Sequence, residues 1–244
     1  MSKLGKPGLC FVLLIMVCQP AMAQDVSITL GEDGSLATRS IQLLVLVTLL
    51  SIVPGLAIMI TSFPFMVTVL SILRQGIGLQ QSPPNMLIVS LALFLTYFVM
   101  EPVFVLAWAN GIDPLINGNM PLEDAFFQTL EPFRGFMAGR VAEDTFNELA
   151  SLRPGIDPTL PVESSPLSVL IPSFLLSEIE RAFQIGFLIF LPFLIIDLVV
   201  AAILMSMGMM MVPPAIVSLP FKLGFFVVAD GWSLIAGSLV RSYF

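Results

Sequence analysis

Residues 193–214 read FLIIDLVVAAILMSMGMMMVPP, an apolar segment that ends in a methionine-rich turn and a pair of prolines. Glycine commonly follows the last turn of a helix, and proline is favoured at the first position of one. Gly208 therefore ends one predicted helix, and Pro213 or Pro214 begins the next. Apolar residues lie on both sides of this turn, so the stretch predicts a hairpin of two hydrophobic helices.

The rest of the chain has the same apolar character. Of its 244 residues, 57% are hydrophobic and 11% are charged, and the mean hydropathy is +0.99. Soluble domains carry about 25% charged residues, so the composition is that of a membrane protein. We expect an all-α, polytopic membrane protein with about four hydrophobic helices forming hairpins. The predicted spans are Ile41–Ile60, Met86–Trp108, Ala182–Met207 and Ile216–Val240.

The first residues predict a cleaved secretory signal peptide over 1–23. Lys3 and Lys6 precede the short apolar run Leu9–Cys18, and small residues then place the cleavage between Ala23 and Gln24. An uncleaved transmembrane helix is the alternative, but the apolar run is too short to cross about 30 Å of hydrocarbon.

Four segments follow the signal peptide. Residues 24–39 form a short N-terminal periplasmic segment, and residues 40–108 form the N-terminal hydrophobic helices. Residues 109–180 form an acidic periplasmic helical segment, in which Pro121–Leu149 has the spacing of an amphipathic helix or a helical pair. Residues 181–244 form the C-terminal hydrophobic hairpin.

Charge sets the expected orientation in the membrane. Residues 110–180 contain eleven acidic residues and three arginines, a net charge of −8. Because basic residues favour the cytoplasmic side, this segment is expected outside, in the periplasm of a Gram-negative cell. Four spans after signal removal would also place both mature ends there.

The residue types that are missing narrow the chemistry. Histidine is absent, and both cysteines, Cys10 and Cys18, lie within the predicted signal peptide. Ser-His and Cys-His nucleophiles need a histidine base, and most zinc sites need His or Cys. The sequence also has no Gly-rich Lys-Ser/Thr loop for a nucleotide. We expect no enzyme activity, no metal and no cofactor, and no nucleic acid as a partner.

Two ionisable residues interrupt the last two apolar segments. Asp197 lies eleven residues before Gly208, and Lys222 lies nine residues after Pro213. At a rise of about 1.5 Å per residue, both lie about 14–16 Å from the turn, matched within about 3 Å. We predict that they pair at one depth, within one chain or with a neighbouring one. A lysine that extends to the membrane surface beside an aspartate in a wet gap is the alternative.

The turn itself holds Met205, Met207, Met209, Met210 and Met211. Methionine side chains are flexible and adapt to surfaces of varied shape. If several chains met around an axis, these side chains could close a pore and yield to a passing polypeptide. Apolar filling of a membrane loop and a thioether site for Cu(I) are the alternatives.

Several segments resemble one known family. They are FQIGFLIFLPFLIIDLVVAAILMSMGMMMVPP at 183–214, SLPFKLGFFVVADGW at 218–232, LRQGIGLQQSPPN at 73–85, LALFLTYFVMEPV at 91–103 and EPFRGFM at 131–137. Together they resemble the FliP family, the export-gate proteins of flagellar type III secretion, whose injectisome relatives are called SctR. The resemblance covers most of residues 40–244.

The resemblance implies a function that composition does not show. It implies a homo-oligomeric ring, a pentamer in the family, joined by FliQ, FliR and other export-apparatus membrane proteins. This ring lies in the inner membrane at the centre of the flagellar basal body and passes unfolded flagellar proteins. The implied fold is a ring-like helical assembly that is raised largely out of the bilayer plane. An injectisome gate and a small-ion or copper transporter remain the alternatives.

The resemblance also implies roles for individual residues. Met209, Met210 and Met211 map onto the family's pore gasket, and Asp197 and Lys222 map onto its Asp and Lys. Candidates for helix packing or pore lining are Phe183, Gln184, Phe187, Glu178 and Arg181. The chain departs from the family at Phe65, where a basic residue is frequent, at Glu101, where a small or apolar residue is expected, and at Glu180, where a basic residue is usual.

Overall fold

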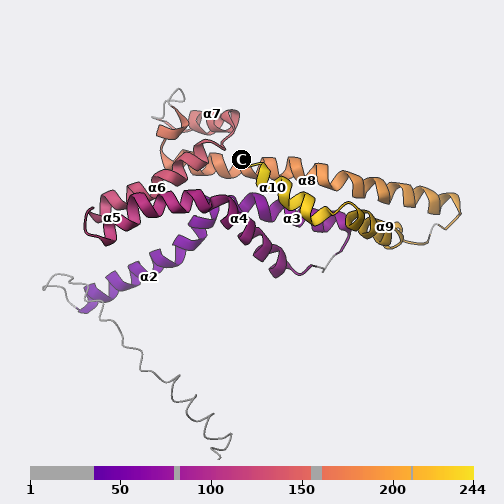
Figure 1. The fold of residues 1–244 in the computed structure, drawn as a ribbon, viewed down its shortest axis with the longest axis horizontal. Coiled ribbons are helices and arrows are strands. Elements are labelled where there is room, and N and C mark those ends of the chain that lie inside the picture. Colours follow the sequence, from indigo (N-terminus) through magenta and orange to yellow (C-terminus); the bar gives the residue numbers. More distant parts are fainter. Residues whose placement is uncertain (1–35, 80–82, 155–160, 210) are drawn as a thin grey trace, which may run out of the picture. The chain divides into compact units, whose positions relative to one another are not determined.

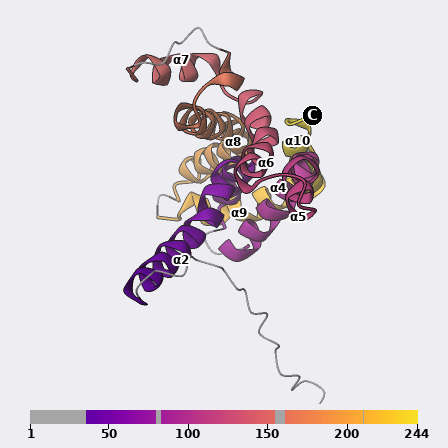
Figure 2. The ribbon, with the colours of Figure 1, turned by 90° about the vertical axis from the view of Figure 1, so that its left-hand side faces the viewer.

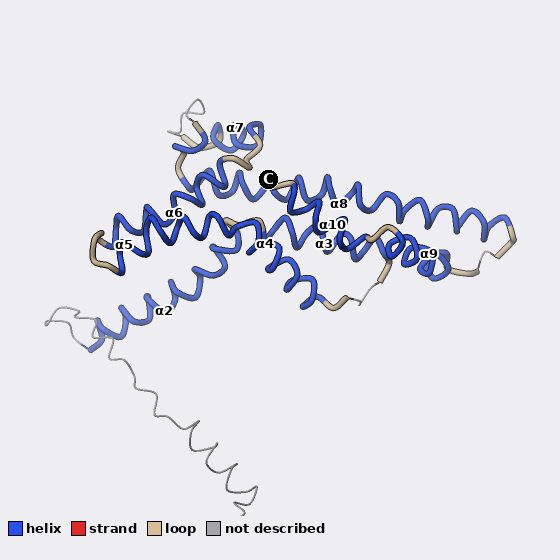
Figure 3. Tube along the Cα trace, in the orientation of Figure 1, coloured by secondary structure: helices blue, strands red, loops and turns tan. Residues whose placement is uncertain are grey.

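The computed structural model describes residues 36–79, 83–154, 161–209 and 211–244, and these residues form helices and connecting loops without a strand (Figure 3). The predicted cleavage site at Ala23 and Gln24 lies outside the described residues. Statements on packing concern residues 50–244, which form one compact unit.

The helices follow one another with short connections (Figure 1). In chain order they are α2 (Leu36–Met59), α3 (Phe63–Ile77), α4 (Asn85–Ala107), the π-helix η1 (Trp108–Ile112), α5 (Asp113–Ile116), α6 (Leu122–Ala138), α7 (Glu143–Ser151), the 3₁₀-helix η2 (Val162–Ser164), α8 (Leu167–Ser206), α9 (Pro214–Val228) and α10 (Gly231–Arg241). The all-α prediction is confirmed.

Helix α3 is the centre of the core, and it packs against α4, α8 and α9. Pro64 lies in its first turn, where proline costs no hydrogen bond, and Gly78 ends it with φ +86°. The contact with α8 is close because Gly186 has no side chain there. A Cβ on Gly186 would lie 2.4 Å from Ile72 Cδ1. Most of the largest buried side chains of this core, including Phe65 and Phe193, lie on α3 and α8.

The acidic segment folds back on this core as a pair of helices. Helix α6 packs against α4 and η1, and α7 packs against the first half of α8 through Phe146, Ala150 and Val169. Figure 1 and Figure 2 both show α7 beside α8. The predicted helical pair within Pro121–Leu149 is therefore observed as α6 and α7.

Three described helices are long and apolar enough to cross a membrane, and a bent pair of helices is a fourth candidate. The three are Arg39–Met59, Asn85–Ile116 and Leu167–Ser206, and the bent pair is α9 with α10. About four hydrophobic helices were expected, but two of them differ from the expected spans.

The third predicted span begins too late. Helix α8 starts at Leu167 rather than Ala182, so the expected segment boundary at 180/181 lies inside one continuous helix of 40 residues. The boundary was placed at the end of the acidic segment, whose last acidic residues are Glu178 and Glu180. In the structure the Glu178 side chain is buried and paired, so the charge does not interrupt the helix.

The fourth predicted span, Ile216–Val240, is not one straight helix. Helices α9 and α10 meet at an angle of 62°. The break is at Asp230, whose φ of +49° and ψ of 46° are left-handed values that a continuous helix does not contain.

Candidate functional site

The structure brings Asp197 and Lys222 together within one chain. Lys222 Nζ on α9 lies 2.5 Å from Asp197 Oδ2 on α8, across the hairpin. The lysine side chain is only 6% exposed and the aspartate side chain 32% exposed. An ammonium group with so little water around it needs a counter-charge, and the carboxylate of Asp197 supplies it.

Ser218 is a third member of this site that the sequence reasoning missed. Its hydroxyl donates a hydrogen bond of 2.5 Å to Asp197 Oδ1, and the serine is fully buried. Each carboxylate oxygen of Asp197 thus has its own donor on α9. Ser218 and Lys222 are four residues apart, which places them on one face of a helix. That spacing is the signal that could have identified the serine.

The end of α3 also reaches this site. A Cβ on Gly78 would lie 3.7 Å from Lys222 Nζ and 3.6 Å from Leu219 Cδ1. The last carbonyls of a helix carry partial negative charge, so the end of α3 is a favourable environment for an ammonium group. We call Asp197, Ser218 and Lys222, together with the end of α3 at Gly78, the hairpin charge site.

The methionine turn connects the two helices that carry this site. Gly208 follows α8 with φ +75°, and its amide donates to Met205 O at 3.0 Å. The next amide, that of Met209, donates to Leu204 O at 3.0 Å. These two bonds are the Schellman pattern that closes a helix C-terminus, and Pro214 begins α9 as predicted.

The methionine side chains of this turn point away from the chain's own core. Met205, Met207, Met209 and Met211 are all exposed, and Met211 is 96% exposed. Met210 lies outside the described residues. Four large apolar side chains in one turn leave a surface that is not covered within this chain.

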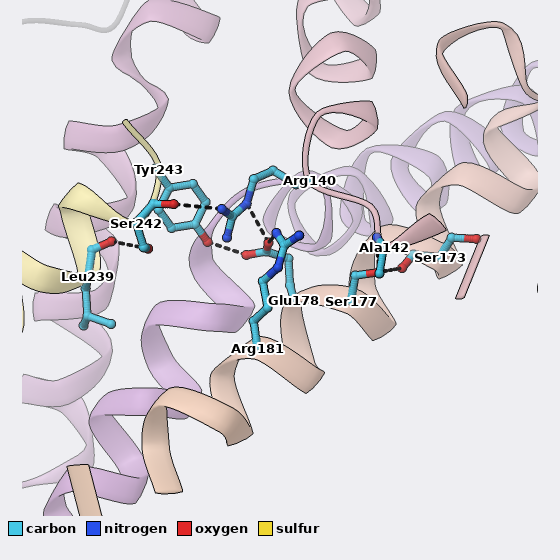
Figure 4. Close-up of polar contacts among 9 residues, drawn as sticks. All are labelled: Arg140, Ala142, Ser173, Ser177, Glu178, Arg181, Leu239, Ser242 and Tyr243. Carbon is cyan, nitrogen blue, oxygen red and sulfur yellow. Dashed lines mark hydrogen bonds and ion pairs between the residues drawn. The ribbon is translucent and has the colours of Figure 1, made fainter. Parts of the chain in front are cut away.

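A second charged cluster surrounds Glu178 on α8, as Figure 4 shows. The Glu178 side chain is fully buried. Arg140 Nε lies 2.9 Å from Glu178 Oε1, and Arg181 Nη1 lies 3.5 Å from the same oxygen. The Tyr243 hydroxyl donates to Glu178 Oε2. We call these four residues the Glu178 cluster.

Arg140 holds three parts of the chain at this point. It lies between α6 and α7, and its Nη1 donates to Ser242 O at 2.8 Å. Its guanidinium carbon also lies 4.1 Å from the centre of the Tyr243 ring, a cation–π distance. Burial and the neighbouring Glu178 carboxylate raise the pKa of the Tyr243 phenol far above its usual range. The phenol therefore stays protonated and remains a donor at neutral pH.

The structure separates the five residues expected for helix packing or pore lining. Glu178 packs inside the chain, so a pore-lining role for it does not fit this structure. Its carboxylate is buried because two arginines and a phenol satisfy it. Phe183, Gln184 and Phe187 are exposed, and Arg181 is partly exposed.

The three departures from the family pattern have clear positions. Phe65 is fully buried, with its ring edge-on to Tyr243 at 5.5 Å between centroids. It therefore lies next to the Glu178 cluster, where Arg140 and Arg181 supply the positive charge. Glu180 is exposed and accepts a 3.0 Å bond from Gln184 Nε2. Glu101 is exposed on α4.

Within the described ranges no three His, Cys, Asp or Glu side chains lie close enough together to hold a metal ion.

Comparison with known proteins identifies the family of this chain. The FliP family model matches residues 46–239. The chain belongs to the FliP family. It is 49% identical to the flagellar biosynthetic protein FliP of Caulobacter vibrioides over 247 residues, which cover 99% of this chain and 92% of the relative. The FliP of Rhizobium meliloti is 50% identical, over 86% of each chain, and that of Bacillus subtilis is 40% identical, over 91% of this chain and 100% of the relative.

Membership of the FliP family agrees with the apolar helices of the fold. The chain is a membrane component of the flagellar export apparatus. These three relatives are flagellar proteins, which favours the expected flagellar system over the injectisome alternative. The family is not known for enzyme activity.

Proposed function

We propose that copies of this chain assemble with FliQ and FliR into the pore of the flagellar export gate, through which unfolded flagellar proteins are secreted. The observation that carries this proposal is the exposed methionine turn on a hairpin whose register is fixed by the pair of buried Lys222 and partly exposed Asp197.

The pair and the turn have complementary properties. Asp197, Ser218 and Lys222 fix α8 against α9 through two hydrogen bonds of 2.5 Å. The turn beyond them presents unbranched thioether side chains, which change shape at little cost. A hairpin with a fixed register and flexible methionine side chains at its turn suits a pore that is closed at rest. The same side chains can move aside for polypeptides of varied sequence.

The apolar surface of the same hairpin supports assembly with other chains. Large side chains on both helices are exposed, among them Leu198, Ile203, Phe221 and Val228. An apolar groove of about 490 Å³ between α8 and α9 is lined by Val199, Ile203, Val217 and Phe221. Surfaces of this kind are normally covered by lipid or by partner chains. In the proposed ring, neighbouring copies, FliQ and FliR cover part of them.

The proposed mechanism is passive gating. The methionines of several copies meet around an axis and close the path, and the incoming polypeptide displaces them. The sequence has no nucleotide-binding loop, so the energy for export comes from other components. We place the gate in the inner membrane at the centre of the basal body, with the acidic segment and both mature ends in the periplasm.

The test is native mass spectrometry of the full chain in mild detergent, with and without co-expressed FliQ and FliR. The proposal predicts a multi-copy complex that takes up both partners. A monomer or dimer that ignores both partners would contradict it. A titration of that species with Cu(I) would then test the transporter alternative.

A further inference from the structure

The bend between α9 and α10 shortens this pair of helices. The separate helices have 15 and 11 residues, or about 22 and 16 Å at 1.5 Å per residue. Joined at a bend of 62°, the two helices extend about 33 Å from end to end, close to the thickness of about 30 Å of hydrocarbon. One straight helix from Pro214 to Arg241 would measure about 42 Å, so straightening would lengthen the pair by about 9 Å.

The bend costs backbone energy. Asp230 is the one non-glycine residue with positive φ among the described residues. A left-handed conformation is unfavourable for a residue that has a Cβ, because the Cβ approaches the following carbonyl oxygen. Other contacts must offset this cost if the bent form is to persist.

Some of the contacts that offset this backbone cost lie at the bend itself. Gly231 is buried, and a Cβ there would lie 2.2 Å from Phe226 Cε2. The Phe226 ring also meets Trp232 edge-on at 5.4 Å. The absence of a side chain at Gly231 lets the start of α10 lie against the Phe226 ring of α9.

The other contacts that offset the backbone cost of the bend lie at the C-terminal end of α10. Ile235 and Leu239 are buried in the core, and the next turn ends in Ser242 and Tyr243. Arg140 binds the Ser242 carbonyl, and the Tyr243 hydroxyl binds the buried Glu178 carboxylate (Figure 4). The phenol ring is enclosed further by Phe65 edge-on and by Phe136 stacked at 6.0 Å.

We propose that the Glu178 cluster is a latch that holds α10 at its angle to α9, and that Asp230 is the hinge about which α9 and α10 straighten when the latch opens. Arg140 belongs to the connection between α6 and α7, so movement of that connection opens the latch. Helix α9 carries Ser218 and Lys222, so the latch is mechanically linked to the hairpin charge site. The proposal does not depend on the pore function.

The test measures the distance between spin labels at positions 216 and 238 in the full chain, reconstituted in lipid nanodiscs. Ile216→Cys and Ser238→Cys carry the labels, because both positions are exposed, in a background with Cys10→Ser and Cys18→Ser. A helix straightened from 62° lengthens this distance by about 5 Å. A second label pair at Gln75→Cys and Leu188→Cys reports on the α3–α8 core.

The variants are Tyr243→Phe, which removes one hydroxyl, and Arg140→Gln, which removes the guanidinium. Tyr97→Phe and Arg153→Gln are the matched controls, because Tyr97 and Arg153 are exposed and lie outside the Glu178 cluster. We expect a second population about 5 Å longer for the 216–238 pair in both latch variants, with no change in the 75–188 pair or in the controls. An unchanged 216–238 distance in both latch variants would overturn the latch. A change in both label pairs would overturn it too, because the cluster would then hold the whole fold rather than α10.

Discussion

Ser218 and Asp197 form a hydrogen bond of 2.5 Å on the carboxylate oxygen that Lys222 leaves free. Asp197 therefore holds two residues of α9 at once, and α9 is fixed in both depth and rotation relative to α8. The consequences of this arrangement can be tested one residue at a time.

We expect Asp197→Ala to abolish motility and Ser218→Ala to reduce it. The first change leaves a buried ammonium without its counter-ion, and breaking a buried pair in this way typically costs about 3–5 kcal/mol. The second removes one hydrogen bond to a charged group, worth about 1.5–3 kcal/mol. Ser206→Ala is the control, because that exposed hydroxyl donates to the Ile203 carbonyl of its own helix. Soft-agar motility measures all three, and normal motility for Asp197→Ala would refute the role of the site.

The pair should behave as a unit. Asp197→Asn with Lys222→Met removes both charges, so no buried ion is left unpaired. We expect the double variant to retain more folded protein in the membrane than Lys222→Met or Asp197→Asn alone, measured by thermal stability in detergent. Strictly additive losses would show that the two side chains are energetically independent.

Gly78 should be more sensitive than another glycine of the same conformation. Gly78 and Gly118 have φ of +86° and +70°, so alanine strains both backbones similarly, by about 1 kcal/mol. A Cβ at Gly78 contacts Lys222 Nζ, whereas a Cβ at Gly118 would meet nothing within 4 Å. The contact at Gly78 is an ordinary van der Waals distance, but relaxation of the strained end of α3 would move the group that lies beside Lys222. We therefore predict that Gly78→Ala reduces secretion more than Gly118→Ala does at equal protein level. Equal secretion would remove Gly78 from the hairpin charge site.

Replacing Met209, Met210 and Met211 with alanine should make the resting membrane leaky. Three alanines leave a wider opening than three methionines if the side chains meet around an axis. The measurement is the entry of a small solute into cells that express the complete gate, compared with cells that carry Met86→Ala, an exposed methionine on α4. Unchanged permeability would favour the view that the methionines only fill a membrane loop.

The mature protein should begin at Gln24. Mass spectrometry of the N-terminal peptide of protein purified from membranes decides this, and a peptide that contains Lys3 would refute the cleaved signal.

The hairpin charge site could be predicted from the sequence because its parts are close along the chain and its helix ends are marked. Gly208 and the two prolines fix the turn, and counting from it places Asp197 opposite Lys222. The role of Ser218 could not be predicted, because a serine in an apolar helix is common and the partner of this serine lies on the other helix.

The Glu178 cluster could not be found in this way. Arg140 is 38 residues from Glu178 and Tyr243 is 65 residues from it, so no local spacing relates them. The same difficulty explains the span that was predicted to start at Ala182. A charged residue in an apolar stretch predicts the end of a membrane span unless its distant partners are known. For Glu178 those partners are Arg140 and Tyr243.

The bend at Asp230 is a similar case. The sequence Asp-Gly marks a turn, but whether it breaks a helix depends on what holds the two halves. In the structure that is the core around Leu239 together with the Glu178 cluster.

The central claim, that methionine turns of several copies meet around one axis, is tested most directly by cross-linking. Met211→Cys, in the chain without Cys10 and Cys18, is treated with a short bis-maleimide in membranes that contain FliQ and FliR, and Leu152→Cys on an exposed position after α7 is the control. We predict a cross-linked dimer for Met211→Cys, since one thiol per chain can be joined to one other, and monomer for Leu152→Cys. Monomer for Met211→Cys in a gate of normal mass would contradict the claim.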